Sequence, residues 1–482
     1  MIGRFSLSLS LLTLFVAACP AVAAEESQTA KRPPNIIFIL ADDLGYGDLG
    51  CYGQRQIQTP RLDQMAKEGM RFTDCYAGST VCAPSRCSLM TGLHTGHAWV
   101  RGNAGRRPLR PEDVTVAEVL KQRGYATGAI GKWGLGEVDS TGFTGRQGFD
   151  YWFGYLDQGH AHNYYPTFLW RNDKKVPLRN EVQHVILGKN RYPRGMATKR
   201  VDYSHDIFTN EALQFVEKHA DEPFFLYLAY TIPHANNEAG NLGEKAPPFR
   251  GMEVPDLGPY KNKKWPGPQK GHAAMITRMD ADVGRLIDLL KKLDIDDETI
   301  VFFSSDNGPH GEGGAKPAFF KSSGPLRGHK RSLHDGGIRV PMIVRWPGHI
   351  PADTTSDLPC AFWDFLPTAA ELAGTDTPSG LDGVSLIPTL LGKPGQKQHD
   401  FLYWEFHERG DQQAVRMGRW KAIRKRVGRP LELYDLTADP GEKHNVAADH
   451  PDVVTQIETY LKTARSHSPM WSIGPPQEKK TK

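Results

Sequence analysis

The hydrophobic and polar positions of the chain predict alternating strands and helices. Residues 35–40 form a continuous apolar run, which is typical of a strand buried on both faces. Residues 59–70 predict an amphipathic helix that begins at a Thr-Pro pair. Three later stretches, 115–136, 204–234 and 273–310, each predict an amphipathic helix followed by a buried strand and a polar loop.

This alternation predicts an α/β fold in which a large, mostly parallel or mixed central sheet carries helices on both faces. Such sheets bind ligands at the carboxyl ends of their strands, so the polar loops should share one edge. From about residue 393 the pattern predicts a small C-terminal α+β domain with an antiparallel sheet. We expect a large domain over 33–390, a C-terminal subdomain over 395–470 and a tail without ordered structure over 471–482.

The first 24 residues predict a secretory signal peptide rather than part of the fold. An arginine precedes an apolar run over 5–18, and small residues follow it. The run is too short to span a membrane, and no later segment is long and apolar enough. Two processing routes stay open: cleavage after Ala23 or Ala24, or a lipoprotein box at 16–19 with a lipid anchor on Cys19. Both routes make the mature protein extracytoplasmic, either periplasmic or secreted.

Charge and cysteine content narrow the class of protein. With 59 basic and 55 acidic residues the net charge is +4 and the two signs are mixed, which argues against a nucleic-acid partner. A local basic pocket for an anionic substrate remains compatible with this balance. The cysteines lie at positions 19, 51, 75, 82, 87 and 360. Loss of Cys19 with the signal would leave an odd number, too few for a disulfide scaffold in so long a chain.

Acidic and amide side chains follow two of the predicted strands directly. Asp42 and Asp43 come after the strand at 35–40, and Asp306 and Asn307 come after a later strand. Carboxylate and amide oxygens are hard ligands, which suit calcium or magnesium better than zinc or copper. Either pair alone could instead shape a turn or cap a helix. Both pairs on one sheet edge predict a binding site for one divalent cation.

The most specific pattern in the chain surrounds Cys82. The stretch CAPSRCSLMTGLHTGH, which begins at this residue, resembles the C-x-P-S-R signature of the type I sulfatases of the alkaline phosphatase superfamily. The motifs DDLGYGD, GKWGLG, IPH and DNG and the small C-terminal domain resemble the same arylsulfatase-like family over most of the chain. The resemblance implies an alkaline phosphatase-like fold, a catalytic domain over 33–390, hydrolysis of sulfate esters and one Ca²⁺ ion.

The resemblance also implies that a maturation enzyme converts Cys82 to formylglycine (3-oxoalanine). The hydrated aldehyde offers one hydroxyl that attacks sulfur with help from the cation, and a second that lets the aldehyde reform and release sulfate. Residue 82 would then belong to the metal site as well. Arg86, one helical turn later, can point its guanidinium at this residue or at the metal ligands. The alternative for Cys82 is an ordinary buried thiol beside a turn.

The resemblance assigns further catalytic roles to two lysines and a histidine. Lys132 in GKWGLG matches a lysine that binds a sulfate oxygen, and Lys330 in LRGHKRSLHDGGIRVP matches a second one. His234 in TIPH matches the histidine that faces the leaving-group oxygen. Taken alone, each lysine could equally be a solvated surface charge.

One position departs from the family pattern. Many members read Gly-Lys-Trp-His-Leu-Gly, with a histidine that assists at the formylglycine, where this chain has Gly134. Either the base comes from elsewhere, or this branch of the family works differently. His160 and His162 in DQGHAHNYYP and His310 after DNGP are the candidate substrate-binding residues, and we favour His162 as the base. Each could instead be a loop histidine bonded to its neighbours.

Two further segments bear on the substrate. Residues 149–170 are dense in aromatic side chains without clear periodicity, so they form either a stacking platform for sugar rings or a satellite core under a loop. Residues 233–272 form a long polar, proline-rich insertion of the kind that shapes a substrate cleft. With the secretion signal, these features favour polysaccharide degradation, with a galactose or N-acetylgalactosamine sulfate as the substrate.

Two other classes of function stay open. A phosphodiesterase or phosphonate monoester hydrolase could use the same scaffold, but its two-metal relatives need further His and Asp ligands that we do not find in the sequence. An inactive glycan-binding homologue would account for Gly134, but the intact CAPSR motif argues against it. The sequence therefore favours a one-metal sulfatase.

Overall fold

The computed structural model describes residues 1–3, 6, 32–103, 107–184, 194–238 and 249–473. The described residues from Pro33 onward form one compact unit. Almost all of the expected signal peptide, with its processing sites at residues 19 and 23–24, lies outside the described residues and stays a prediction. No helix within the described stretches combines the length and the apolar character needed to cross a membrane.

A ten-stranded sheet with the strand order β13-β2-β12-β11-β1-β10-β4-β5-β6-β7 forms the centre of this unit. Five strands in its middle run parallel to one another. They are β11(Thr299–Ser305), β1(Asn35–Ala41), β10(Phe224–Ala229), β4(Ala126–Lys132) and β5(Tyr151–Tyr155). The outer strands are shorter and mostly antiparallel. They are β12(Met342–Arg345), β2(Met70–Phe72), β13(Thr354–Ser356), β6(Phe168–Arg171) and β7(Lys174–Pro177).

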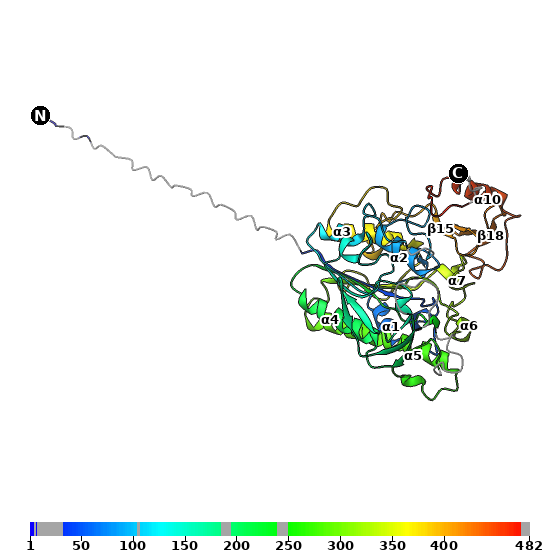
Figure 1. Cartoon of the computed structure of the whole chain (residues 1–482). Helices are drawn as coiled ribbons and strands as arrows, with labels where there is room; N and C mark the ends of the chain where they lie inside the picture. The colour runs from blue at the N-terminus through cyan, green and yellow to red at the C-terminus, as the bar shows by residue number, and fades with distance from the viewer. Residues whose placement is uncertain (4–5, 7–31, 104–106, 185–193, 239–248, 474–482) are drawn as a thin grey trace, which may run out of the picture. The chain divides into compact units, whose positions relative to one another are not determined.

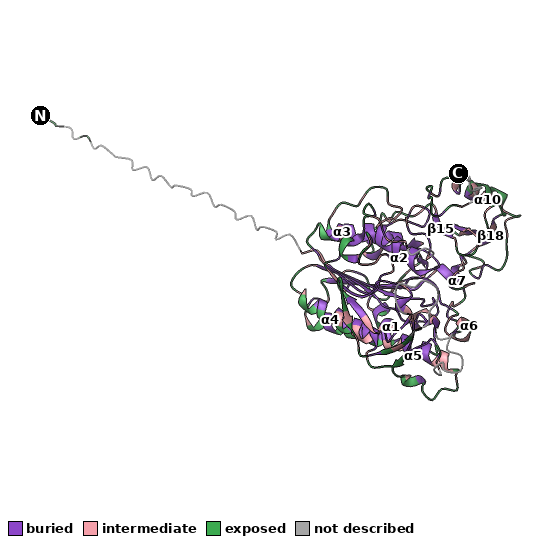
Figure 2. Cartoon of the chain, in the orientation of Figure 1, coloured by how far each residue is buried: buried purple, intermediate pink, exposed green. Residues whose placement is uncertain are grey.

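Helices cover both faces of the sheet, which confirms the predicted α/β class. One face carries α2(Cys82–Thr91), α3(Val116–Lys121) and α8(Phe365–Ala373), and the other carries α1(Pro60–Lys67), α4(Ser204–Lys218) and α5(Gly267–Lys292). Successive side chains of a strand point to opposite faces, so Phe38 of β1 packs into the first core and Ile39 into the second. Figure 1 shows the two groups of helices on opposite sides of the sheet, and Figure 2 shows the buried sheet between them.

A separate antiparallel sheet of four strands follows, as predicted for the C-terminal part. Its strands are β15(Leu402–Phe406), β16(Gln412–Met417), β17(Trp420–Arg424) and β18(Glu432–Asp435), and α10(Pro451–Tyr460) packs against one face. On the other face Trp404 packs with Tyr76 and Trp363, and its indole N–H donates to the Ala77 carbonyl at 2.9 Å. This sheet therefore packs directly on the segment that leads into α2 (Figure 1).

The ordered chain continues past the predicted start of the tail. Trp471 is buried, packs against Gly102 and donates its indole N–H to the Trp99 carbonyl at 2.9 Å. A buried tryptophan removes so much apolar surface from water that it fixes the chain around it. The expectation of an unordered tail from residue 471 is therefore wrong at its start, and residues 474–482 lie outside the described part of the chain.

Short elements complete the described structure. The short strands are β3(Cys75–Tyr76), β14(Cys360–Ala361), β8(Glu181–His184) and β9(Gly195–Lys199), and the short helices are α6(Pro317–Phe320), α7(Asp335–Ile338) and α9(Ile387–Leu390). The 3-10 helices are η1(Gly50–Tyr52), η2(Thr144–Arg146), η3(His160–His162), η5(Gly258–Tyr260) and η6(Phe362–Asp364). All cysteines within the described residues are free thiols, so none of them contributes to a disulfide framework.

Candidate active site

The four predicted oxygen ligands meet at the carboxyl ends of two neighbouring strands. β1 and β11 pair in parallel, so Asp42 and Asp306 follow the two strands side by side. Hydrogen bonds link the two loops: the Asp43 N–H donates to Asp306 Oδ1 at 3.1 Å, and Asn307 Nδ2 donates to Asp43 Oδ1 at 2.7 Å. All four side chains are fully buried. The predicted proximity of the two pairs is confirmed.

The donors and charges of this cluster fit a hard divalent cation. Asn307 Oδ1 is buried and has no hydrogen-bond partner in the described structure, so its lone pairs are available to a ligand. Burial and the neighbouring Asp42 raise the pKa of Asp306 to about 7, because both oppose a further negative charge in the cluster. Carboxylate and amide oxygens are the ligands that Ca²⁺ and Mg²⁺ prefer.

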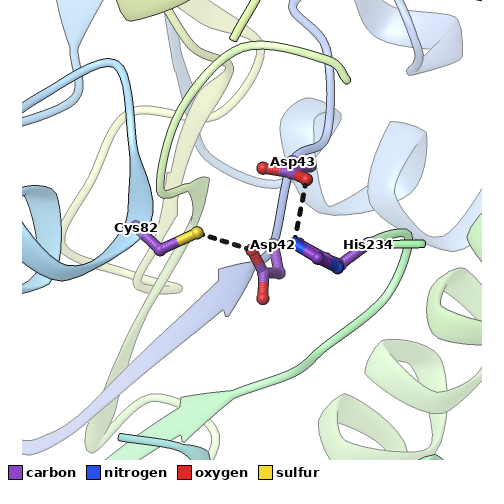
Figure 3. Close-up of side chains that lie close together, drawn as sticks. All are labelled: Asp42, Asp43, Cys82 and His234. Carbon is purple, nitrogen blue, oxygen red and sulfur yellow. Dashed lines mark hydrogen bonds and ion pairs between the residues drawn. The ribbon is translucent and has the colours of Figure 1, made fainter. Parts of the chain in front are cut away.

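Cys82 begins α2, and its thiol faces the acidic cluster. Its Sγ lies 3.4 Å from Asp42 Oδ1 (Figure 3). Burial and Asp42 hold the pKa of the thiol well above its usual value, so the unmodified side chain is a poor nucleophile. One turn further along α2, Arg86 donates to Asp306 Oδ2 at 2.8 and 3.0 Å and to the Lys132 carbonyl at 2.6 Å. The guanidinium therefore points at the acidic cluster, as the spacing predicts.

Two buried lysines neutralise the same carboxylates. Lys132 Nζ lies 2.6 Å from Asp42 Oδ2, and Lys330 Nζ lies 2.7 Å from Asp43 Oδ2 and 3.2 Å from His234 Nε2. Burial lowers the pKa of Lys330, but Asp43 and other neighbours outweigh it and raise the pKa above its usual value. Both ammonium groups are thus held charged inside the protein, and the alternative of solvated surface lysines is wrong.

His234 is held in one orientation beside Lys330. Its Nδ1 donates to the Ala235 carbonyl at 2.7 Å, so the neutral ring has its lone pair on Nε2. Burial and Lys330 hold the pKa of His234 well below its usual range. Figure 3 shows the ring beside Asp43 and close to Asp42, on the side of the cluster away from Cys82.

A cavity of about 350 Å³ opens beside Cys82, His234 and Lys330. Most of the residues that line it are polar or charged, and the lining includes no Phe, Tyr or Trp side chain from the described residues. Most of the wall comes from residues that the sequence did not single out: Asn103, Gly136, Gln158, Arg107, Arg194, Asn237 and Arg331. Asn237 and Arg331 adjoin the TIPH and Lys330 motifs, which could have flagged them. Gly136 and Gln158 belong to the GKWGLG and DQGHAHNYYP stretches. Asn103, Arg107 and Arg194 lie on loops whose approach no local pattern reveals.

Of the three candidate histidines, His162 reaches the cavity. It lines the wall and stacks on the His234 ring, with centroids 4.9 Å apart and planes 17° apart. Its Nδ1 lies 3.0 Å from an oxygen of Glu238, a buried carboxylate that the sequence reasoning missed. His162 is therefore neither a solvated loop residue nor a residue of the apolar core.

The other two histidines lie behind the cavity wall. His160 is buried, with its ring edge-on to Tyr155, and it does not line the cavity. His310 bonds through Nε2 to the Pro233 carbonyl at 2.9 Å, and its Nδ1 accepts the Glu312 N–H at 3.0 Å. Both ring nitrogens of His310 are thus engaged by backbone. The structure does not bring either residue to the place where we expected substrate contacts.

The aromatic segment 149–170 belongs to the core. Trp152, Phe153 and Tyr155 of β5 and Tyr164 are all buried and join the clusters on the two faces of the sheet. The expectation of an exposed platform for sugar rings is wrong. The alternative of a satellite core under a loop is right about the burial of these rings but not about their place, because they join the two main core clusters. Part of the polar insertion, residues 239–248, lies outside the described residues.

Gly134 lies in the cavity wall with a left-handed backbone, at a φ of 79°. A Cβ at this position would lie 3.1 Å from Gln158 Cγ, so Gln158 occupies the space that a side chain would need. Gln158 Nε2 donates to Asn103 Oδ1 at 3.3 Å, and the same oxygen accepts the Ala83 N–H at 3.0 Å at the start of α2. The wall is therefore built around a glycine here.

These features of the site define a class of protein. Buried carboxylates bridged by lysines and an arginine, at the carboxyl ends of parallel strands and beside a polar cavity, suit the hydrolysis of anionic esters. The Sulfatase family profile matches residues 34–375, and the profile "N-sulphoglucosamine sulphohydrolase, C-terminal" matches residues 328–467. The chain therefore belongs to the sulfatase family of sulfuric ester hydrolases.

Known proteins and solved structures are similar to this chain over most of its length. Arylsulfatase A of Homo sapiens is 35% identical over 477 residues, covering 89% of this chain and 87% of that protein. N-acetylgalactosamine-6-O-sulfatase of Bacteroides thetaiotaomicron is 31% identical and covers 92% of this chain and 95% of that protein. The structure of Ps i-CgsB in complex with k-i-k-neocarrahexaose matches at a TM-score of 0.73 and 30% identity, over 90% of this chain and 93% of that chain. Phosphonate monoester hydrolase of Agrobacterium radiobacter, at 21% identity, a TM-score of 0.62 and coverage of 89% and 95%, shares the fold alone.

Installing the histidine common in the family, by Gly134→His, is expected to lower both stability and activity. A side chain with a Cβ at this left-handed position costs about 1–2 kcal/mol, and the imidazole would displace Gln158 from Asn103. Thermal unfolding and sulfate-ester hydrolysis of the variant would measure the two effects. A variant with a higher kcat than the wild type would contradict the view that this wall is built around a glycine.

Proposed function

We propose that this chain is a secreted, calcium-dependent sulfatase of sulfated carbohydrates, with Cys82 converted to formylglycine. One observation carries the proposal: Cys82 Sγ is 3.4 Å from the Asp42 carboxylate, at the wall of a cavity that His234 and Lys330 also line. A maturation enzyme would recognise CAPSR. The expected signal peptide would export the chain to the periplasm or the medium, with a lipid anchor on Cys19 as the alternative.

Two relatives support a carbohydrate substrate. One is named for N-acetylgalactosamine 6-O-sulfate, and Ps i-CgsB is in complex with neocarrahexaose. The cavity wall of this chain adds arginine and amide groups, which donate hydrogen bonds to hydroxyl and sulfate oxygens. We take a galactose or N-acetylgalactosamine sulfate as the substrate class.

The charged side chains of the cluster have separate roles in the reaction. Lys132 and Lys330 offset the negative charge of the sulfate group in a place that water does not screen. His234 protonates the leaving oxygen through Nε2, which first takes up a proton because it carries the lone pair of the neutral ring. Arg86 holds Asp306 in place through its two hydrogen bonds. Formylglycine, when formed, supplies a hydroxyl nucleophile that a thiol does not offer.

The oxygen ligands for the cation are Asp42, Asp43, Asp306 and Asn307, together with residue 82. When bound, a divalent cation acts as a Lewis acid toward sulfate oxygens. The buried carboxylates hold that charge in place, and the free Oδ1 of Asn307 completes the set of donors. Calcium and magnesium both suit these oxygens, and we propose calcium on the family resemblance.

Removing the cation is expected to lower stability as well as activity. A chelator should lower the Tm, and Ca²⁺ at about 100 times its Kd should restore about 2.7 kcal/mol of stability. Asp306→Asn should weaken this response. Asp296→Asn, at a carboxylate outside the site that pairs with Arg345, should leave it intact. A Tm that does not change with chelator or Ca²⁺ would contradict the metal site.

Sulfate release by the purified protein, co-expressed with a formylglycine-generating enzyme, tests the proposed function. The substrates are sulfated galactans, glycosaminoglycan disaccharides and an aryl sulfate, and the mass of the peptide with residue 82 reports the modification. We expect release that Cys82→Ala abolishes and that Cys87→Ala, the same change further along α2, preserves. A confirmed aldehyde with no release from any substrate would overturn the proposal.

A further inference from the structure

His162 and Glu238 form a buried pair at the cavity wall. His162 ends η3 and lines the cavity together with Cys82 and Gly134. Its Nδ1 lies 3.0 Å from Oε2 and 3.3 Å from Oε1 of Glu238, whose side chain is 1% exposed. The two residues are 76 positions apart, so no local pattern in the sequence predicts the pair.

The hydrogen bond decides which nitrogen of His162 can exchange a proton. An ionised carboxylate only accepts hydrogen bonds, so His162 carries a proton on Nδ1. Nε2 is then the nitrogen that takes up and releases a second proton. A buried carboxylate in this position also holds the ring firmly, because water does not screen its attraction to the Nδ1–H group.

The surroundings hold both partners in place. The Glu238 N–H donates to Asn236 Oδ1 at 3.2 Å, and Asn236 Nδ2 donates to Glu253 Oε2 at 2.9 Å. The His162 ring lies nearly parallel to the His234 ring, which limits its rotation. Support of this kind keeps a proton-transfer group in its productive geometry.

Three other charged or titratable groups face the pair. His234 stacks on His162, Lys330 lies 3.2 Å from His234 Nε2, and Arg194 Nη1 lies 3.9 Å from Glu238 Oε1. Glu238 is the carboxylate that bonds to the His162 ring, so it is the group that fixes the orientation of the ring.

We infer that Glu238 is a positioning residue that orients the His162 ring, so that His162 Nε2 exchanges a proton with the reacting group at residue 82. The pair replaces the histidine that many family members carry at the position of Gly134. The proton passes from the reacting hydroxyl to Nε2 and on to water, and Nδ1 keeps its hydrogen bond to Glu238 throughout. The inference rests on the proposed sulfatase function.

The test is Glu238→Gln, which keeps the shape of the side chain and removes its charge. We expect kcat to fall about 10- to 100-fold. The pH–rate profile of kcat should also change, because the ring that exchanges the proton has lost its charged partner. Glu238→Asp keeps the charge and should recover part of kcat. Glu222→Gln, which breaks a histidine–glutamate pair with His219 away from the cavity, should change neither quantity.

Two outcomes overturn the inference. One is a wild-type kcat and pH profile in Glu238→Gln. The other is an equal loss from Glu238→Gln in a His162→Ala background, because a residue that acts through His162 then has nothing to position. If Glu238→Gln unfolds, Glu238→Asp decides the question in the same assays. A modified wild type that releases no sulfate overturns the proposed function and this inference together, whereas an active wild type with an unaffected Glu238→Gln overturns the inference alone.

Discussion

Replacing Lys132 by methionine is expected to lower kcat/KM for sulfate release about 100- to 1000-fold. Lys132 Nζ is buried 2.6 Å from Asp42 Oδ2, on the carboxylate that also contacts Cys82. A charge in this place attracts a sulfate group strongly, because water does not screen it. Methionine fills a similar volume without the charge. Separate kcat and KM values at saturating Ca²⁺ would show whether transition-state or ground-state binding is lost.

Lys121→Met supplies the matched control for this prediction. Lys121 ends α3, is about half exposed and pairs with Asp150. The same change of side chain and charge there should leave kcat/KM within about twofold, since exposed ion pairs contribute little. A Lys132→Met variant with near-wild-type kcat/KM would show that Lys132 does not contact the sulfate group.

The charged centre of the site could be predicted because its residues follow strands of one sheet. Asp42 and Asp306 come directly after β1 and β11, and parallel pairing places such loops at one edge. Cys82 and Arg86 lie one helical turn apart, so their relation is local. The cavity wall could not be predicted in the same way. Glu238 reaches His162 from another loop, and a contact between two loops leaves no periodicity in the sequence.

The aromatic segment was ambiguous for a physical reason. Both faces of β5 are covered, with Trp152 in one core cluster and Phe153 in the other. A strand buried on both faces shows no alternation of apolar and polar side chains, so its pattern resembles that of an irregular aromatic loop. The burial of Trp471 could not be predicted from the sequence either, because it depends on Gly102 and Trp99 from a distant loop. Composition alone does not reveal such a partner.

The second large effect is expected on stability, at the contact between the four-stranded sheet and α7. Lys421 of β17 is fully buried, with its Nζ 2.6 Å from Asp335 Oδ1 and 3.3 Å from Glu442 Oε1. Asp335 begins α7, shortly after Lys330, so this ion pair also anchors the loop that carries Lys330. Lys421→Met is expected to lower the free energy of unfolding by about 3–5 kcal/mol. Among the described residues, the change leaves Glu442 without an ion-pair partner and leaves Asp335 with Arg339 alone. Denaturant unfolding followed by tryptophan fluorescence would measure the change.

The pH dependence of this loss separates its electrostatic cause from simple repacking. Burial, with Asp335 nearby, already raises the pKa of Glu442 to about 7, and loss of the ammonium should raise it further. A carboxyl whose pKa is higher in the folded than in the unfolded chain binds a proton on folding, so stability falls as pH rises between the two values. The deficit of Lys421→Met should therefore be smaller at about pH 5.5 than at about pH 8. Lys425→Met, beside an exposed pair with Glu432, should change stability by less than about 0.5 kcal/mol at either pH. A deficit independent of pH would assign the loss to packing instead.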